Sequence, residues 1–197
     1  PKGAMLTHSN LWSSAIALVT LIGLKEEDRV LHAAPMFHLA DGALTQGGML
    51  AGSTHVFIPM FTPAGTISAI SKYKTSHALL VPVMIQMVIN DPSIKGADLS
   101  SLRFILYGAS PISEAVLVRA MNTFSQADFA QGYGQTELAP LATMLSPAYH
   151  VTEGPKAGKL KSAGQASPCV EIKSADEDGN ALESGKIGEI AVRGPNA

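Results

Sequence analysis

Short apolar segments alternate with amphipathic segments between residues 29 and 133, and this alternation constrains the fold more than any other feature of the chain. The segments between the apolar runs carry apolar residues at helical spacing. Strands that alternate with helices are typical of βαβ units, so the sequence predicts an α/β fold with a mainly parallel sheet flanked by helices. The expected strands are residues 29–35, 54–59, 76–82, 102–108 and 128–134. We expect the fifth of these to be the last strand of the series.

Capping signals indicate where several helices begin. Thr7 or Ser9 precedes the first helical pattern and can accept a hydrogen bond from its first turn. Ser110 and Pro111 suit the N-cap and first position of the helix that follows residues 102–108, with Glu114 in its first turn. We therefore expect that helix to start directly after the strand.

The pattern changes after residue 145. Residues 146–168 are rich in Gly, Ser, Lys and Pro, and residues 169–195 alternate apolar with polar residues around two turn signals. We expect an α/β subdomain over residues 1–145 and a small, incomplete antiparallel β subdomain over residues 146–197. Both ends of the chain look cut, so we expect a piece of a longer protein.

Charge and hydropathy exclude two classes of partner. The formal net charge is −2 and no cluster of Lys and Arg occurs, which argues against nucleic acid. The longest apolar run, residues 78–89, is too short and too interrupted to cross a membrane.

Cys169 is the only cysteine, so no internal disulfide can form. We expect the side chain of Cys169 to be buried and the protein to be cytoplasmic. Peripheral membrane contact of the full protein and its oligomeric state stay open.

The segment QGYGQTE at residues 131–137 combines several kinds of chemistry. Gly132 and Gly134 leave the main chain uncovered. Tyr133 offers an aromatic face on which a base can stack. Thr136 offers a hydroxyl group, and Glu137 offers a carboxylate, a hard oxygen ligand suited to Mg²⁺. ATP with magnesium would use all of these groups, although the spacing also fits a surface turn with a chance acid.

Two further segments are candidates for a site. YGASP at residues 107–111 follows an apolar strand at the edge where open α/β sheets bind ligands, although any strand–helix junction of such a fold can look similar. His38 in APMFHLADG is the second candidate, with a core histidine bonded to the main chain as the alternative. Neither of the phosphate-loop patterns G-x-x-x-x-G-K-[ST] and G-x-G-x-x-G occurs.

Five motifs in order resemble the adenylate-forming superfamily of acyl-CoA synthetases, luciferases and peptide-synthetase adenylation domains. PKGAMLTH is similar to the end of that family's phosphate loop, and PMFH, YGASP, GYGQTE and GEIAVRGP are similar to its later motifs. MFHLAD and GASPIS look most like fatty or medium-chain acyl-CoA ligases. The resemblance covers essentially the whole chain and implies part of the large N-terminal domain of such an enzyme.

The resemblance implies a two-step reaction in which ATP activates a carboxylic acid to an acyl-adenylate and coenzyme A then forms the thioester. It implies that Tyr133 stacks on adenine, that Thr136 bonds the α-phosphate and that Glu137 holds Mg²⁺, which makes Thr136 and Glu137 the expected catalytic residues. The other residues that it implies are Gly108, Ala109, Ser110, Gln131, Gly132 and Gly134 for ATP or AMP, and His38, Tyr107 and Gly108 for the acyl group or coenzyme A.

Several parts of the family pattern are missing from this chain. The hydroxyl-rich half of the phosphate loop would precede Pro1, with Lys2 at the exit of that loop. An acid for the ribose, a hinge and a mobile domain with a catalytic lysine would follow Ala197. We therefore predict that the isolated chain is inactive. Two alternatives remain: adenylation of an aryl or amino acid, and a non-catalytic interaction module with this nucleotide-binding fold.

Overall fold

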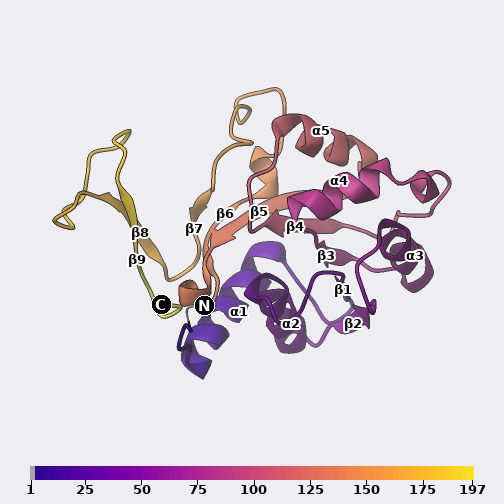
Figure 1. Ribbon diagram of the computed structural model, residues 1–197, viewed down its shortest axis with the longest axis horizontal. Helices are drawn as coiled ribbons and strands as arrows, with labels where there is room; N and C mark the ends of the chain where they lie inside the picture. The colour runs from indigo at the N-terminus through magenta and orange to yellow at the C-terminus, as the bar shows by residue number, and fades with distance from the viewer. Residues whose placement is uncertain (1–2) are drawn as a thin grey trace.

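The computed structural model describes residues 3–197, and helices and strands alternate along most of this range (Figure 1). The helices are α1 (His8–Ile22), α2 (Leu39–Ala51), α3 (Pro63–Tyr73), α4 (Pro82–Asn90) and α5 (Glu114–Thr123). The strands are β1 (Arg29–His32), β2 (Thr54–Phe57), β3 (His77–Leu79), β4 (Phe104–Gly108), β5 (Asp128–Gly134), β6 (Leu141–Leu145), β7 (Gln165–Ala166), β8 (Glu171–Ala175) and β9 (Glu189–Arg193). Short 3-10 turns are η1 (Pro92–Ile94), η2 (Thr136–Leu138) and η3 (Pro147–Tyr149).

A seven-stranded sheet forms the middle layer of the α/β part, in the order β2-β1-β3-β4-β5-β6-β7. The strands from β2 to β5 in this order are parallel to one another. Strand β6 is antiparallel to β5, and β7 is antiparallel to β6. Helices α1 and α2 cover one face, whereas α3, α4 and α5 pack against the other (Figure 1). The predicted mainly parallel sheet between helices is confirmed.

Strand β4 shows why the sequence folds this way. Its residues alternate between the two apolar cores: Ile105 and Tyr107 pack with α3, α4 and α5, and Phe104 and Leu106 pack with α1 and α2. All four are buried. A strand buried on both faces reads as a continuous apolar run rather than as an alternation, which is what the segment FILY shows.

The start of α5 corrects one expectation. The helix begins at Glu114, and its N-cap is Ser113, whose hydroxyl accepts a hydrogen bond from the Val116 amide at 3.3 Å. Ser110 therefore does not cap this helix. Ala109 has a φ of 63° and the chain bends there as it leaves β4, and the chain stays non-helical up to Ser113, which is extended.

The prediction that β5 is the last strand of the series is wrong. Residues 141–145 form β6, which pairs antiparallel with β5, and β7 extends the sheet further. All five residues of β6 are buried, so its sequence lacks the apolar–polar alternation that marks a half-exposed strand. Strand β7 also belongs to the large sheet, although it lies after residue 145. The expected boundary between two subdomains at residue 145 stays a prediction.

Strands β8 and β9 form a separate two-stranded antiparallel sheet that projects from the α/β part (Figure 1). Cys169 lies just before β8 and is exposed, not buried as expected, because it occupies a turn with a φ of 64°. Across residues 3–197, no helix is both long enough and apolar enough to span a bilayer.

The carboxyl ends of β4 and β5 approach so closely that a side chain does not fit between them. Gly108 pairs with Gly132 in the parallel register. A Cβ atom on Gly108 would lie 2.2 Å from the carbonyl oxygen of Gly132. On the other side of β5, toward β6, a Cβ atom on Gly134 would lie 1.7 Å from the carbonyl oxygen of Pro140. Both distances are far inside van der Waals contact, so glycine is needed at these positions for the strands to keep their spacing.

We therefore predict that Gly108→Ala destabilises the chain. Overpacked positions cost about 1–3 kcal/mol because the main chain must move to admit the added atoms. Urea unfolding of the variant measures the loss. Gly3→Ala is the matched control, since nothing lies within 4 Å of a Cβ at that position. Equal unfolding midpoints for Gly108→Ala and the unaltered chain would contradict the packing argument.

Candidate active site

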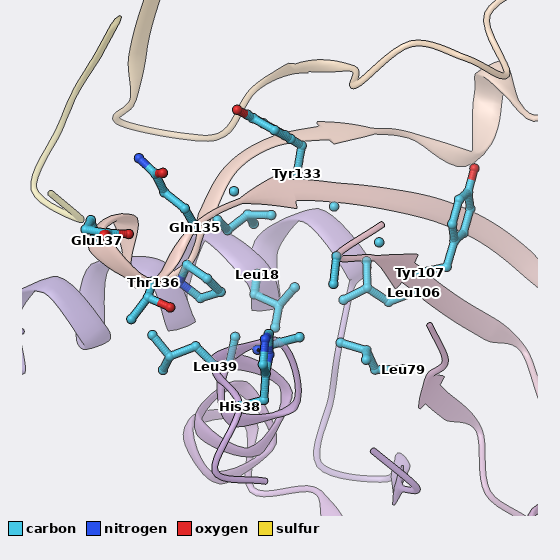
Figure 2. A pocket seen from close by; sticks show the side chains of 18 residues that line it. Leu18, His38, Leu39, Leu79, Leu106, Tyr107, Tyr133, Gln135, Thr136 and Glu137 are labelled. Carbon is cyan, nitrogen blue, oxygen red and sulfur yellow. Dashed lines mark hydrogen bonds between the residues drawn. The ribbon is translucent and has the colours of Figure 1, made fainter. Parts of the chain in front are cut away.

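A cavity of about 310 Å³ lies at the carboxyl ends of β4 and β5, bounded by η2 and by the start of α2 (Figure 2). This is the edge at which open α/β sheets bind ligands. Two residues expected from the sequence, Ser110 and Gln131, do not line it. The expected residues that do line it are His38, Tyr107, Gly108, Ala109, Gly132, Tyr133, Gly134, Thr136 and Glu137.

The rim of the cavity is polar and accessible. Thr136 and Glu137 lie next to each other on η2, and both are exposed. The Tyr133 side chain is on the β5 side of the rim and is 38% exposed. Figure 2 shows His38 and Tyr133 on opposite sides of the cavity, with Thr136 and Glu137 toward one end. An aromatic face, a hydroxyl and a carboxylate are thus available to one ligand.

The main chain after β4 leaves the sheet beside Tyr133. Gly108 is in register with Gly132, so Ala109 follows at the level of Tyr133 on the neighbouring strand. Ala109 lines the cavity, whereas Ser110 is exposed beyond its edge. A flat ligand against the Tyr133 ring would therefore also lie close to uncovered main chain at the end of β4.

The floor of the cavity is apolar, and sequence reasoning missed it. Leucines from α1, β3, β4 and β6 line it and belong to the core between the sheet and α1 and α2. The sequence gives little indication of this floor, because the position of each leucine is explained by the apolar face of its own helix or strand. These residues are Leu18, Leu79, Leu106 and Leu141.

A buried polar network holds the start of α2, where His38 lies. His38 is the N-cap, and its Nδ1 accepts a hydrogen bond from the Ala40 amide at 3.2 Å. Asp41 in the first turn is fully buried, and its carboxylate lies 2.8 Å from Nδ1 of His32 on β1. Nε2 of His32 lies 2.7 Å from Nδ1 of His55 on β2. Burial, and then the nearby His32, lower the pKa of His55, against an opposing effect of Asp41. This chain of contacts ties the helix start to the sheet.

Tyr107 reaches the cavity with its main chain, because its ring points away from the cavity (Figure 2). The His150 ring donates from Nδ1 to the Ser146 carbonyl oxygen at 3.0 Å, so its Nε2 accepts the Tyr107 hydroxyl at 2.9 Å. Burial raises the pKa of Tyr107. Burial also lowers the pKa of His150, although the bond to Ser146 and the charge of Asp128 act in the opposite direction. The pair joins β4 to the segment after β6.

The donor set at the rim fits a metal ion that arrives with phosphates. Among residues 3–197, no group of three or more His, Cys, Asp and Glu side chains is arranged to hold a metal. Mg²⁺ commonly takes only one or two protein carboxylates and fills its remaining positions with phosphate oxygens and water. Glu137 at the rim can supply one such carboxylate. Lys2, expected at the exit of the phosphate loop, lies outside the described residues.

Comparison with known proteins decides the family. The AMP-binding enzyme family matches residues 1–197. The chain belongs to this family. It is 36% identical over 197 residues to a feruloyl-CoA synthase from Amycolatopsis sp, covering 100% of this chain and 38% of that protein. The chain thus spans well under half the length of this relative.

Solved structures of AMP-binding enzymes share the fold. A long-chain-fatty-acid-CoA ligase from Archaeoglobus fulgidus superposes with a TM-score of 0.87 at 29% identity, covering 100% of this chain and 40% of that one. The o-succinylbenzoate coenzyme A synthetase of Bacillus subtilis, solved with ATP and a magnesium ion, gives a TM-score of 0.86 at 28% identity, covering 100% and 39%. Membership of the AMP-binding family confirms the resemblance drawn from the motifs. The roles of the individual residues stay predictions.

Buried histidines predict how stability depends on pH. The pKa of His150 in the folded chain lies below its ordinary value of 6.5, and the pKa of His77, also buried, is lowered mainly by burial. The unfolded chain therefore binds more protons as pH falls below 6.5, and the free energy of unfolding decreases. We expect the chain to be less stable at pH 5 than at pH 7, as measured by urea unfolding.

His150→Gln should reduce this difference between pH 5 and pH 7, because it removes one of the groups that must be protonated. His8→Gln, at an exposed position, is the control. A pH dependence that is the same in His150→Gln as in the unaltered chain would show that His150 does not contribute to it.

Proposed function

We propose that the full-length protein is an ATP-dependent acid–thiol ligase that activates a carboxylic acid as acyl-adenylate and transfers it to coenzyme A. One observation carries the proposal: a single cavity of an AMP-binding family chain joins a leucine-lined floor to a rim with Tyr133, Thr136 and Glu137. The floor suits the body of an apolar acid, and the rim suits a nucleotide with its metal. The reacting carboxylate and the α-phosphate would meet between them.

The proposed nucleotide contacts follow from the rim. Tyr133 would stack on adenine, a contact of about 1–3 kcal/mol for a base on an aromatic ring. The main chain of Gly108 and Ala109 would form the opposite wall, which Ser110 would extend beyond the edge of the cavity, and Thr136 would donate its hydroxyl to the α-phosphate. When bound, Mg²⁺ would neutralise charge on the phosphates, with Glu137 among its ligands. The remaining expected residues, at the entrance between the nucleotide and the acyl group, are Gln131, Gly132 and Gly134.

The proposed acid is a fatty acid. The apolar floor favours an alkyl chain, since burial of apolar surface contributes about 25 cal/mol per Å². His38 would lie near the acyl carboxylate or the incoming thiol, and the main chain of Tyr107 would border the same space. An aryl acid is the second candidate, favoured by the similarity to feruloyl-CoA synthase. An α-amino acid is disfavoured, because the one acidic side chain among the described lining residues is Glu137 at the rim.

Pyrophosphate exchange with a panel of acids tests this proposal on the full-length protein. Exchange that depends on fatty acids of increasing length would support the first candidate, and exchange with hydroxycinnamic acids would favour the second. No exchange with any acid would favour the alternative hypothesis of a non-catalytic interaction module. The parent reading frame gives independent evidence, because the enzyme needs a hydroxyl-rich loop upstream and a lysine-bearing domain downstream. The cytoplasm stays the proposed location.

In the full-length protein, Glu137→Gln should slow adenylate formation at least about tenfold, because an amide is a weaker ligand for Mg²⁺ than a carboxylate. Pyrophosphate exchange at saturating acid measures the rate. Glu153→Gln, at an exposed position away from the cavity, is the control for the loss of one negative charge. An unchanged rate in Glu137→Gln would remove this carboxylate from the mechanism.

The isolated 197-residue chain should bind ATP more weakly than about 1 mM and should catalyse neither step. Even millimolar affinity requires about 4 kcal/mol of net binding free energy. Stacking and one hydrogen bond supply little beyond the cost of immobilising the ligand. Isothermal titration calorimetry measures the affinity directly. Micromolar binding of ATP by this chain would contradict the expectation.

A further inference from the structure

The turn that carries Thr136 and Glu137 is held by three main-chain hydrogen bonds of its own. The Leu138 amide donates to the Gln135 carbonyl, the Ala139 amide to the Thr136 carbonyl and the Gln135 amide to the Pro140 carbonyl. A single 3-10 turn has little intrinsic stability, and such turns are short because their hydrogen bonds have poor geometry. The orientation of the two rim side chains therefore also depends on the contacts that this turn makes with the rest of the chain.

Asn196 holds the turn from the C-terminal segment of the chain. Its side-chain Nδ2 donates to the carbonyl oxygen of Leu138 at 2.9 Å and to that of Leu141 at 3.0 Å. Leu138 is the last residue of η2, and Leu141 is the first of β6, so one amide bridges the two ends of the connection. Asn196 is 2% exposed, which keeps water from competing for these bonds.

The segment that carries Asn196 is itself fixed to the beginning of α1. The Nδ2 atom of Asn10 donates to the carbonyl oxygens of Pro195 and Ala197, each at 3.0 Å. Oδ1 of Asn10 accepts from the main-chain amide of Thr7, the N-cap of α1, at 2.8 Å. Figure 1 shows the C-terminal end of the chain beside the start of α1. Asn196 therefore acts on η2 from an anchored position.

We propose that Asn196 is a positioning residue whose side-chain amide keeps Thr136 and Glu137 at the rim of the cavity. The inference rests on the proposed function for the roles of those two residues. It assigns the effect to the donor half of the amide, because Oδ1 of Asn196 has no hydrogen-bond partner among the described residues. A side chain of the same shape without two donors could not bridge the two carbonyl oxygens.

Hydrogen exchange on the full-length protein tests the contact without reference to activity. In Asn196→Ala and in the isosteric Asn196→Asp, the amides of residues 135–139 and 141 should exchange at least about fivefold faster, whereas those of β4 should not change. Asn122→Asp, at an exposed position on α5, is the control. Unchanged exchange at residues 135–139 and 141 in both Asn196 variants would overturn the proposal.

A double-mutant cycle tests the positioning role. Asn196→Ala alone should lower kcat for pyrophosphate exchange about tenfold, a typical effect of removing a residue that orients a metal ligand. If Asn196 acts through the turn, its loss should cost less once Glu137→Gln is present than it does in the unaltered protein, because only Thr136 is then left to be positioned. Independent, multiplicative losses would overturn the inference. If the unaltered protein shows pyrophosphate exchange with none of the acids, the proposed function is overturned instead. The hydrogen-exchange result would still decide whether Asn196 holds the turn.

Discussion

The contact between Gly108 and Gly132 is the constraint on which the rest of the site depends. It lets the carboxyl ends of β4 and β5 lie side by side without an intervening Cβ atom. Strand β4 then contributes Leu106 to the floor and the main chain of Ala109 to the rim. Strand β5 contributes Tyr133 and leads directly into η2. If the two strands moved apart to admit a side chain, the floor and the rim would no longer border one cavity.

Buried polar contacts behind the cavity hold the elements that form it. Asp41 and two histidines tie the start of α2 to β1 and β2, and the pair of Tyr107 and His150 ties β4 to the segment after β6. Asn196 ties η2 to the C-terminal segment. Burying polar groups is unfavourable unless they are hydrogen-bonded, so these contacts set relative positions rather than add much net stability. Side chains held in this way can keep a binding geometry that exposed loops alone would lose.

The sequence predicted the parallel sheet well, because its strands are buried runs separated by helical patterns. It also brought Tyr133, Thr136 and Glu137 together, since these lie within one short segment. The helix start at Ser110 was wrong because Ser110 and Ser113 are the same residue type and both suit an N-cap, and the structure uses Ser113. Strand β6 was missed because it follows β5 across the short turn η2 rather than across a helix, so it lies outside the strand–helix alternation. The leucine floor and Asn196 could not be predicted, because residues far apart in the chain meet there only after the sheet has formed.

We infer that one cavity holds both the nucleotide and the body of the acid. A crystal structure of the full-length protein with a non-hydrolysable acyl-sulfamoyl adenosine tests it most directly. We expect the adenine ring against Tyr133, with the acyl chain on the floor between Leu18 and Leu106. An adenine ring bound away from Tyr133, or an acyl chain outside this floor, would contradict it.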